Sequence, residues 1–219
     1  MVDPLRRQTI EHFSRLIPKS FEEVGKEESY RQVFGEEDTP HPFTVLSLFR
    51  QCQLTPFLPW AYYMACSEGF KALVNGDTHK GALIRLKSED NRIALNGWKR
   101  LCDKNRDIRS TVIISRPPAC KDAACAHEAR LAWMEGAYWH IRSDVLSQWG
   151  MFKMLASSRP PQSPLPANNQ AVQRLRGASP CPVCVDSWLA QEKTMRVEAW
   201  TELPSYFGLP AWENMRTEL

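Results

Sequence analysis

Two cysteine pairs that lie far apart in the sequence constrain the fold of this chain more than any other feature. The first pair has C-x4-C spacing, and the second has C-x2-C spacing at the start of a helical pattern. Zinc binds four thiolates in closed tetrahedral sites, and a helix start favours thiolates because its free N–H groups carry partial positive charge. The sequence therefore predicts one structural zinc ion with the ligands Cys120, Cys125, Cys181 and Cys184.

An alternative interpretation is that these cysteines are partly buried thiols at helix starts. Each lies beside proline or small residues at a predicted helix start, and this placement favours zinc over the alternative. His127 is a substitute ligand if Cys120 or Cys125 is not used. Because four cysteines leave no open coordination position, the zinc would hold the fold together and would not catalyse a reaction.

Cysteine usage and charge also limit the class of protein. The chain of 219 residues has seven cysteines, an odd number, and no export signal, so we expect reduced thiols in an intracellular protein. No apolar run approaches the length of about 20 residues that a membrane helix needs, so we expect no membrane partner. The 28 Lys and Arg residues are interspersed with 25 Asp and Glu residues, which disfavours a nucleic-acid partner.

The spacing of apolar residues predicts a mainly α fold, an irregular helical bundle with at most a minor pair of short strands. Helices are expected over 43–53 and 57–66. The second is apolar on nearly every side, which is typical of a buried helix. Cys52 and Cys66 are accordingly predicted to be core residues.

Further elements follow from capping and turn signals. Ser20 and Glu23 have the spacing of a capping box. Asn75-Gly76-Asp77 indicates a turn before a short strand at 82–86. A helix is expected to begin at Ser88 and to carry Lys104 near its end, where cations suit the helix dipole.

Composition divides the chain into an arm and a main domain. A turn-rich acidic segment indicates a boundary at about residue 42, with an N-terminal helical arm over 1–42 and a helical domain over 43–219. A proline-rich stretch at about 157–170 is predicted to be a flexible linker between the two cysteine pairs. The aromatic tail at 206–212 is expected to pack back on the domain.

No motif in the sequence indicates an enzyme. A glycine-rich phosphate loop, the H-E-x-x-H pattern and the G-x-S-x-G pattern are all missing from the sequence. Glu22, Glu23, Glu27 and Glu28 fit a solvated helix face better than a catalytic site. We therefore expect no catalytic residues in this chain.

Three stretches together carry a family resemblance. They are residues 5–23, the segment FLPWAYYMAC at 57–66, and the four spaced cysteines followed by AWTELPSYFGL at 199–209. In these stretches the chain resembles the C-terminal region that follows the BTB domain of fungal, mainly basidiomycete, BTB/POZ domain proteins. The resemblance implies an all-helical region attached to a protein-interaction domain, without enzymatic activity. Dimerisation stays open, because the BTB domain itself has no counterpart here and Met1 stands at about the helix that would follow it.

Together these observations lead us to expect a non-enzymatic protein–protein interaction module with a structural zinc ion and a protein partner. The alternative is a zinc-containing nucleic-acid-binding or transcription-regulatory protein, in which Lys121, Arg174 and Arg176 face phosphates. Binding that falls steeply with added salt would be the signature of this alternative.

Overall fold

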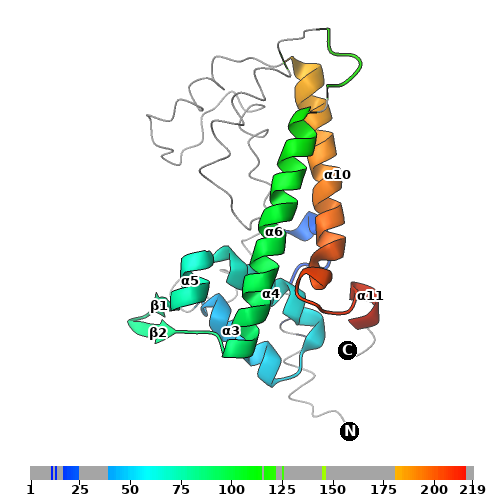
Figure 1. Ribbon diagram of the computed structural model, residues 1–219. Coiled ribbons are helices and arrows are strands. Elements are labelled where there is room, and N and C mark those ends of the chain that lie inside the picture. The colour runs from blue at the N-terminus through cyan, green and yellow to red at the C-terminus, as the bar shows by residue number, and fades with distance from the viewer. Residues whose placement is uncertain are drawn as a thin grey trace.

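The computed structural model describes residues 11, 13, 17–24, 39–114, 116–121, 125, 145–146 and 181–215, and these residues are mostly helical (Figure 1). This confirms the prediction of a mainly α fold with one minor strand pair. In chain order the elements are η1 (Phe21–Glu23), α3 (Pro42–Gln51), η2 (Thr55–Phe57), α4 (Leu58–Ser67), α5 (Phe70–Asn75), β1 (Asp77–His79), β2 (Ala82–Ile84), α6 (Ser88–Ile114), α10 (Pro182–Tyr206) and α11 (Trp212–Met215).

Several predicted features lie outside the described residues. These are the linker at about 157–170, the substitute ligand His127 and the two arginines Arg174 and Arg176. The division into an arm over 1–42 and a domain over 43–219 stays a prediction. In the part of the chain that the structure describes, no helix is both long enough and apolar enough to cross a bilayer.

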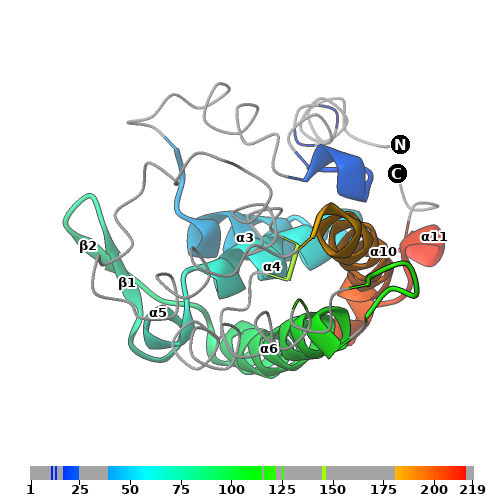
Figure 2. The ribbon, with the colours of Figure 1, turned by 90° about the horizontal axis from the view of Figure 1, so that it is seen from above.

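The two longest helices of the described residues, α6 and α10, pack side by side and run in opposite directions (Figures 1 and 2). The expectation that α6 ends near Lys104 is wrong, because the helix continues to Ile114. Leu101, Ile108 and Val112 are fully buried and follow one another at helical spacing, so an apolar stripe extends the helix beyond its cluster of cations.

Helix α4 lies among the other helices and contacts α3, α5, α6 and α10 (Figure 2). Most of its residues are buried, as predicted for a helix that is apolar on nearly every side. Cys66 is fully buried, and its Sγ lies 3.3 Å from the backbone oxygen of Ala94. The prediction of a core position is confirmed for Cys66.

The same prediction is wrong for Cys52, which is exposed. Helix α3 ends at Gln51, earlier than the apolar pattern predicts, because Gln53 adopts a left-handed conformation with φ of 53°. The backbone N–H of Leu54 then donates to the oxygen of Phe49, and that of Gln53 donates to the oxygen of Arg50. This pair of hydrogen bonds is a Schellman motif, which ends the helix. Cys52 follows one turn after the exposed Leu48, so it lies on the solvent side of α3.

A two-residue turn joins β1 and β2, which pair antiparallel with Asp77 opposite Ile84 and His79 opposite Ala82. The turn residues Lys80 and Gly81 have φ of 49° and 78°, as a tight hairpin of this kind requires. The turn predicted at Asn75-Gly76-Asp77 therefore ends helix α5, and the hairpin turn follows it.

The N-terminus of α6 is tied to α3 and α4 by a buried carboxylate. Asp90 accepts a hydrogen bond from the Tyr62 hydroxyl at 2.7 Å and forms an ion pair with Arg50, whose Nε lies 2.8 Å from the carboxylate. Burial and the Asp90 hydrogen bond raise the pKa of the Tyr62 phenol. This network joins three helices at a position where an unpaired carboxylate would be costly.

The chain after α10 packs back on the helices, as predicted. The ring of Phe207 stacks on Tyr62 and lies against Gly97 so closely that a Cβ at this position would overlap the ring. Trp212 stacks on Trp200 with ring centroids 5.1 Å apart. The aromatic tail is therefore part of the core.

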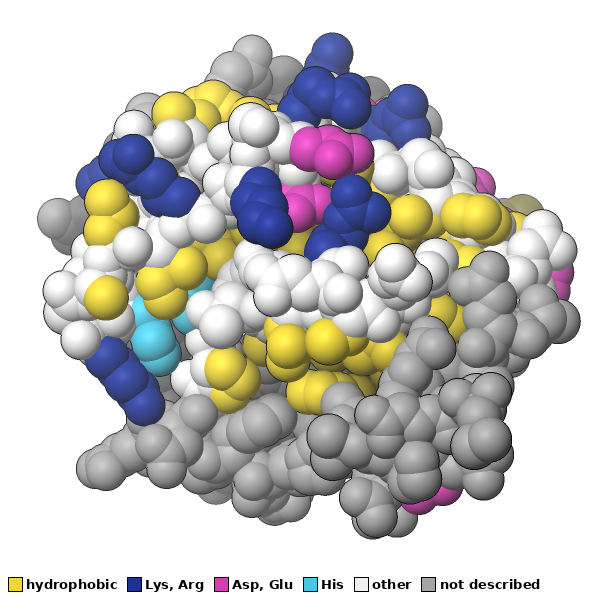
Figure 3. Space-filling view, turned by 90° about the horizontal axis from the view of Figure 1, so that it is seen from below, with side chains coloured by type: hydrophobic (Ala, Val, Ile, Leu, Met, Phe, Trp, Pro, Cys, Tyr) yellow, Lys and Arg dark blue, Asp and Glu magenta, His cyan; other side chains and the backbone are white. Residues whose placement is uncertain are grey.

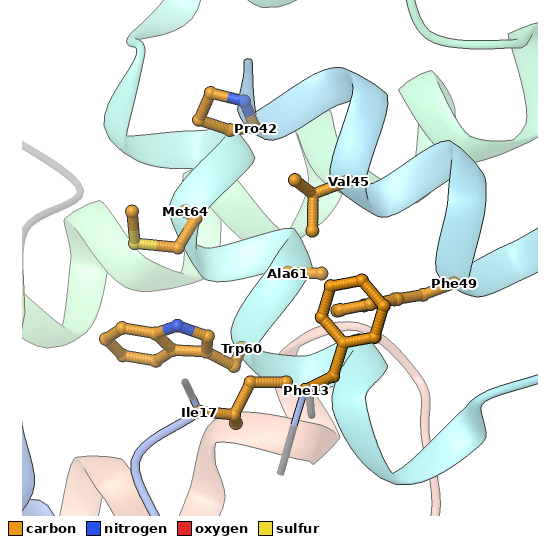
Figure 4. A pocket seen from close by; sticks show the side chains of 8 residues that line it. All are labelled: Phe13, Ile17, Pro42, Val45, Phe49, Trp60, Ala61 and Met64. Atoms are coloured by element: carbon orange, nitrogen blue, oxygen red, sulfur yellow. The ribbon is translucent and has the colours of Figure 1, made fainter. Parts of the chain in front are cut away.

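An apolar hollow lies between α3, α4 and the N-terminal segment (Figure 4). Phe13 packs edge-on against Phe49 with ring centroids 4.9 Å apart. The hollow offers no titratable group, because its lining consists of Phe13, Ile17, Pro42, Val45, Phe49, Trp60, Ala61 and Met64.

Candidate metal centre

The four predicted zinc ligands lie together at one end of the molecule. Cys120, Cys125, Cys181 and Cys184 each offer an Sγ atom, and all four atoms lie within 4.8 Å of one another. This is the end where α6 finishes and α10 begins (Figure 1). The helix pair thus brings together two cysteine pairs that are far apart in the sequence.

The start of α10 positions the second pair. Cys181 is the N-cap residue, Pro182 occupies the first helical position, and the N–H of Cys184 donates to the oxygen of Cys181 at 3.0 Å. Proline suits this position because its fixed φ matches the helix and its missing N–H would have no partner there. Both sulfurs therefore lie in the first turn, where the helix dipole favours negative charge.

A proline-rich turn positions Cys120 after α6. The N–H of Cys120 donates to the oxygen of Pro117 at 2.9 Å, and Arg116 donates from its guanidinium to the oxygen of Cys120 at 2.8 Å. The second bond places a cation beside the cysteine cluster, where it would offset part of the charge of four thiolates.

The sulfur distances match the size of a single metal ion. Zinc–sulfur bonds are about 2.3 Å long, which separates neighbouring sulfurs of a tetrahedral site by about 3.8 Å. The Sγ atoms of Cys181 and Cys120 are 3.7 Å apart, and the backbone N–H of Cys181 donates to Cys125 Sγ at 3.3 Å. The cluster is therefore compatible with a metal site for one ion.

Burial makes this cluster a poor place for uncompensated thiolates. Cys120, Cys125 and Cys184 are at most 4% exposed, and Trp188, one turn after Cys184, is fully buried. Burial raises the pKa of the Cys184 thiol, and the neighbouring sulfurs of Cys120 and Cys181 raise it further. A divalent cation would reverse this preference because it binds thiolates and releases their protons.

The other three cysteines lie elsewhere in the fold. Burial raises the pKa of the Cys66 thiol and raises that of Cys102 to about 11, so both behave as small apolar residues. Cys52 is exposed at the end of α3. Of the cations predicted to lie near the cluster, Lys121 is described and exposed.

A second group of potential ligands was not predicted from the sequence. His41, Glu68 and Asp77 place one ligand atom each within 4.8 Å of the others. They come from three different elements, and nothing in their spacing signals that they meet. His79 lies beside them, with its ring centroid 5.7 Å from that of His41.

The hydrogen bonds of His41 argue against metal binding by this second group. The N–H of Phe43 donates to His41 Nδ1 at 3.2 Å, so this nitrogen acts as an acceptor. Neutral imidazole carries one proton, which must then lie on Nε2, 3.1 Å from an Asp77 oxygen. With both nitrogens engaged, His41 has no lone pair for a metal ion, and we assign it to capping α3.

In comparisons with known proteins, no family model, no curated protein and no solved structure matches the chain.

Proposed function

We propose that the chain is a non-enzymatic protein-interaction module in which Cys120, Cys125, Cys181 and Cys184 bind one structural zinc ion. The observation that carries the zinc site is the convergence of four sulfurs within 4.8 Å. Such a site would join the end of α6 to the start of α10 and hold the antiparallel pair in register.

Zinc fits this donor set better than other metals do. Four thiolates in tetrahedral arrangement select zinc or iron, whereas carboxylate and carbonyl oxygens are the ligands of calcium and magnesium. An iron–sulfur cluster contains several irons and inorganic sulfides, so it needs more space than one ion. The 3.7 Å distance between Cys181 and Cys120 sulfurs supports a single ion.

An interaction role is supported by apolar side chains at the surface and by the family resemblance. Phe70, Val74 and Leu83 are each at least 49% exposed. Exposed apolar groups that lie close together mark surfaces that bind partners. The resemblance to the region after a BTB domain implies the same class of function.

Metal analysis tests the zinc site. The full chain, purified without added metal, is expected to carry about one zinc per molecule. The variants Cys181→Ser and Cys125→Ser should each lose the zinc, whereas Cys52→Ser, at an exposed cysteine outside the cluster, should keep it. A wild-type chain without zinc, or one that carries iron instead, would contradict the proposal.

Quantitative affinity purification tests the interaction role. The immobilised full chain should retain a small set of proteins that a heat-denatured control does not retain. Retention of the same proteins by both samples would contradict a specific interaction surface. This result would leave the zinc site unaffected, so the two halves of the proposal fail independently.

A further inference from the structure

An apolar surface on α5 and the hairpin stands out among the described residues. Phe70 and Val74 are 54% and 49% exposed, and they lie four residues apart, so they share one face of the helix. The opposite face of α5 is anchored in the core by Ala72 and Leu73, which are buried. Helix α5 therefore has apolar residues on its exposed face as well as on its buried face.

Neighbouring elements extend this surface on both sides. On one side the ring of Phe70 packs against Trp98 of α6, with centroids 5.2 Å apart. On the other side the side chains of Leu83 and Arg85 reach Gly76 closely enough to crowd a Cβ built there. Leu83, which is 58% exposed, thus lies beside Gly76. Gly76 ends α5 and comes two residues after Val74. We call Phe70, Val74 and Leu83 the α5–hairpin patch.

Cations outnumber carboxylates along α5 and the hairpin, and the exposed Glu68 and Glu89 lie just outside this segment. Between residues 69 and 87 the single acidic residue is Asp77, and its carboxylate is hydrogen-bonded to His41. Figure 3 shows hydrophobic side chains with Lys and Arg around them on the part of the surface that carries the histidines. The four cations of this segment are exposed: Lys71, Lys80, Arg85 and Lys87.

We propose that the α5–hairpin patch binds an acidic amphipathic segment of a partner protein. Apolar side chains of the segment would cover Phe70, Val74 and Leu83, and its carboxylates would pair with the surrounding cations. The proposal rests on the interaction role given above and is independent of the zinc site. A patch of three side chains is small, which fits a transient contact better than a permanent assembly.

The placement of the apolar residues favours a protein segment over a membrane surface. A surface that enters a bilayer places its apolar residues foremost, with its charged groups facing away from the acyl chains. Here the tip of the hairpin consists of Lys80 and Gly81, and the apolar residues lie behind it on the flank. The hairpin tip would therefore hold the patch away from a flat lipid surface.

The chemistry of the patch also favours a protein segment over single-stranded nucleic acid. Bases bind such surfaces by stacking on aromatic rings. The ring of Phe70 is already packed against Trp98, at an angle of 44° between the ring planes. Val74 and Leu83 are aliphatic and offer no stacking surface.

A binding titration with the full chain tests the proposal. The probe is a labelled amphipathic helical peptide of about 16 residues, with Leu and Phe on one face and Glu and Asp on the other. Fluorescence anisotropy should show saturable binding that weakens with added salt. The double variants Phe70→Ser/Leu83→Ser and Lys80→Glu/Arg85→Glu should each weaken binding by about tenfold or more.

Two controls keep the result specific. Leu48→Ser, at an exposed apolar residue of α3, should leave peptide affinity unchanged. Zinc content and thermal unfolding of each variant should match the wild type, so a folding defect is detected separately. Equal affinity of wild type and both double variants, or no peptide binding, would overturn the proposal. Patch-dependent binding to phosphatidylserine vesicles or to oligothymidylate, without peptide binding, would overturn it in favour of that ligand.

Discussion

The cysteine cluster and the His41–Glu68–Asp77 group both place potential metal ligands within 4.8 Å of one another, but their hydrogen bonds differ. In the cysteine cluster the Sγ of Cys181 contacts that of Cys120, and the N–H of Cys181 donates to Cys125 Sγ. In the second group, both ring nitrogens of His41 already have partners. Whether a group of this kind can bind a metal therefore depends on where its protons lie as well as on the distances between its ligand atoms.

The largest effect is expected from Cys184→Ser. Loss of one ligand should release the zinc, and with it the stabilisation by bound metal, which is about 4 kcal/mol when free zinc exceeds its Kd about 1,000-fold. Urea unfolding with and without added zinc measures this difference. Cys52→Ser is the matched control and should unfold like the wild type. If zinc stabilises wild type and Cys184→Ser equally, the cysteine cluster is not the metal site.

The next largest effect is expected at the end of the molecule where α6 finishes and α10 begins. Removal of the proposed zinc by a chelator should loosen the end of α6 and the start of α10, because a metal bound by the four cysteines would join these segments. Hydrogen exchange should therefore speed up over 105–114 and 181–190 and change little over 58–67, in the buried helix α4. Uniform loss of protection would instead mean that zinc supports the whole fold as one cooperative unit.

A smaller effect is expected from His41→Ala. The variant loses the cap on the Phe43 N–H and the hydrogen bond to Asp77, and N-cap losses cost about 1 kcal/mol. Zinc content should not change. His41→Asn is the matched variant, because asparagine also caps helices well and should recover part of the stability. A fall in zinc content in His41→Ala would show that the second group does bind metal.

The smallest effect is expected in how the stability of the fold changes at acidic pH. The hydrogen bond from His41 lowers the pKa of the Asp77 carboxyl, and the N–H of Thr78 lowers it further. A lowered folded-state pKa means that this contribution is present above the unfolded pKa of about 3.9 and is lost as pH falls through the folded value. Asp77→Asn should therefore lose less stability than the wild type in strong acid. Because acid also releases zinc, the comparison is made in the Cys184→Ser background.

Glu202 provides an independent check of the acid effect. A hydrogen bond from the Tyr206 hydroxyl lowers the pKa of this carboxyl, and Lys104 lowers it further. Glu202→Gln should likewise lose less stability than the wild type below about pH 4. If neither variant differs from its parent in acid, these two carboxylates do not set the acid dependence.

Local sequence patterns predict the parts of this structure that depend on neighbours in the chain. The apolar faces of α3 and α4 and the cysteine at the start of α10 are signals of this kind, and each was found. The length of α6 was not, because its last turns are specified by burial of Ile108 and Val112 against other elements. Local sequence preferences are weaker than such tertiary packing.

Contacts between distant residues were predicted only where their chemistry is distinctive. Two cysteine pairs are a distinctive set of zinc ligands, so we could expect them to lie close together although a long stretch of sequence separates them. His41 and Asp77 are 36 positions apart, and a histidine has many roles, so no pattern indicates their pairing. The end of α3 depends on the left-handed Gln53, a conformation that is uncommon for glutamine, so the sequence did not indicate where the helix stops.

The contact between Gly97 and Phe207 has a consequence for the lengths of the two long segments. Gly97 and Cys120 are 23 positions apart, and so are Cys184 and Phe207. The two antiparallel segments therefore contain the same number of residues between two points of contact, one at the cysteine cluster and one at the Phe207 ring. One inserted residue would lengthen a helix by about 1.5 Å and rotate everything beyond it by about 100°. Insertions and deletions in one segment would thus be tolerated only when the other segment changes by the same number of residues.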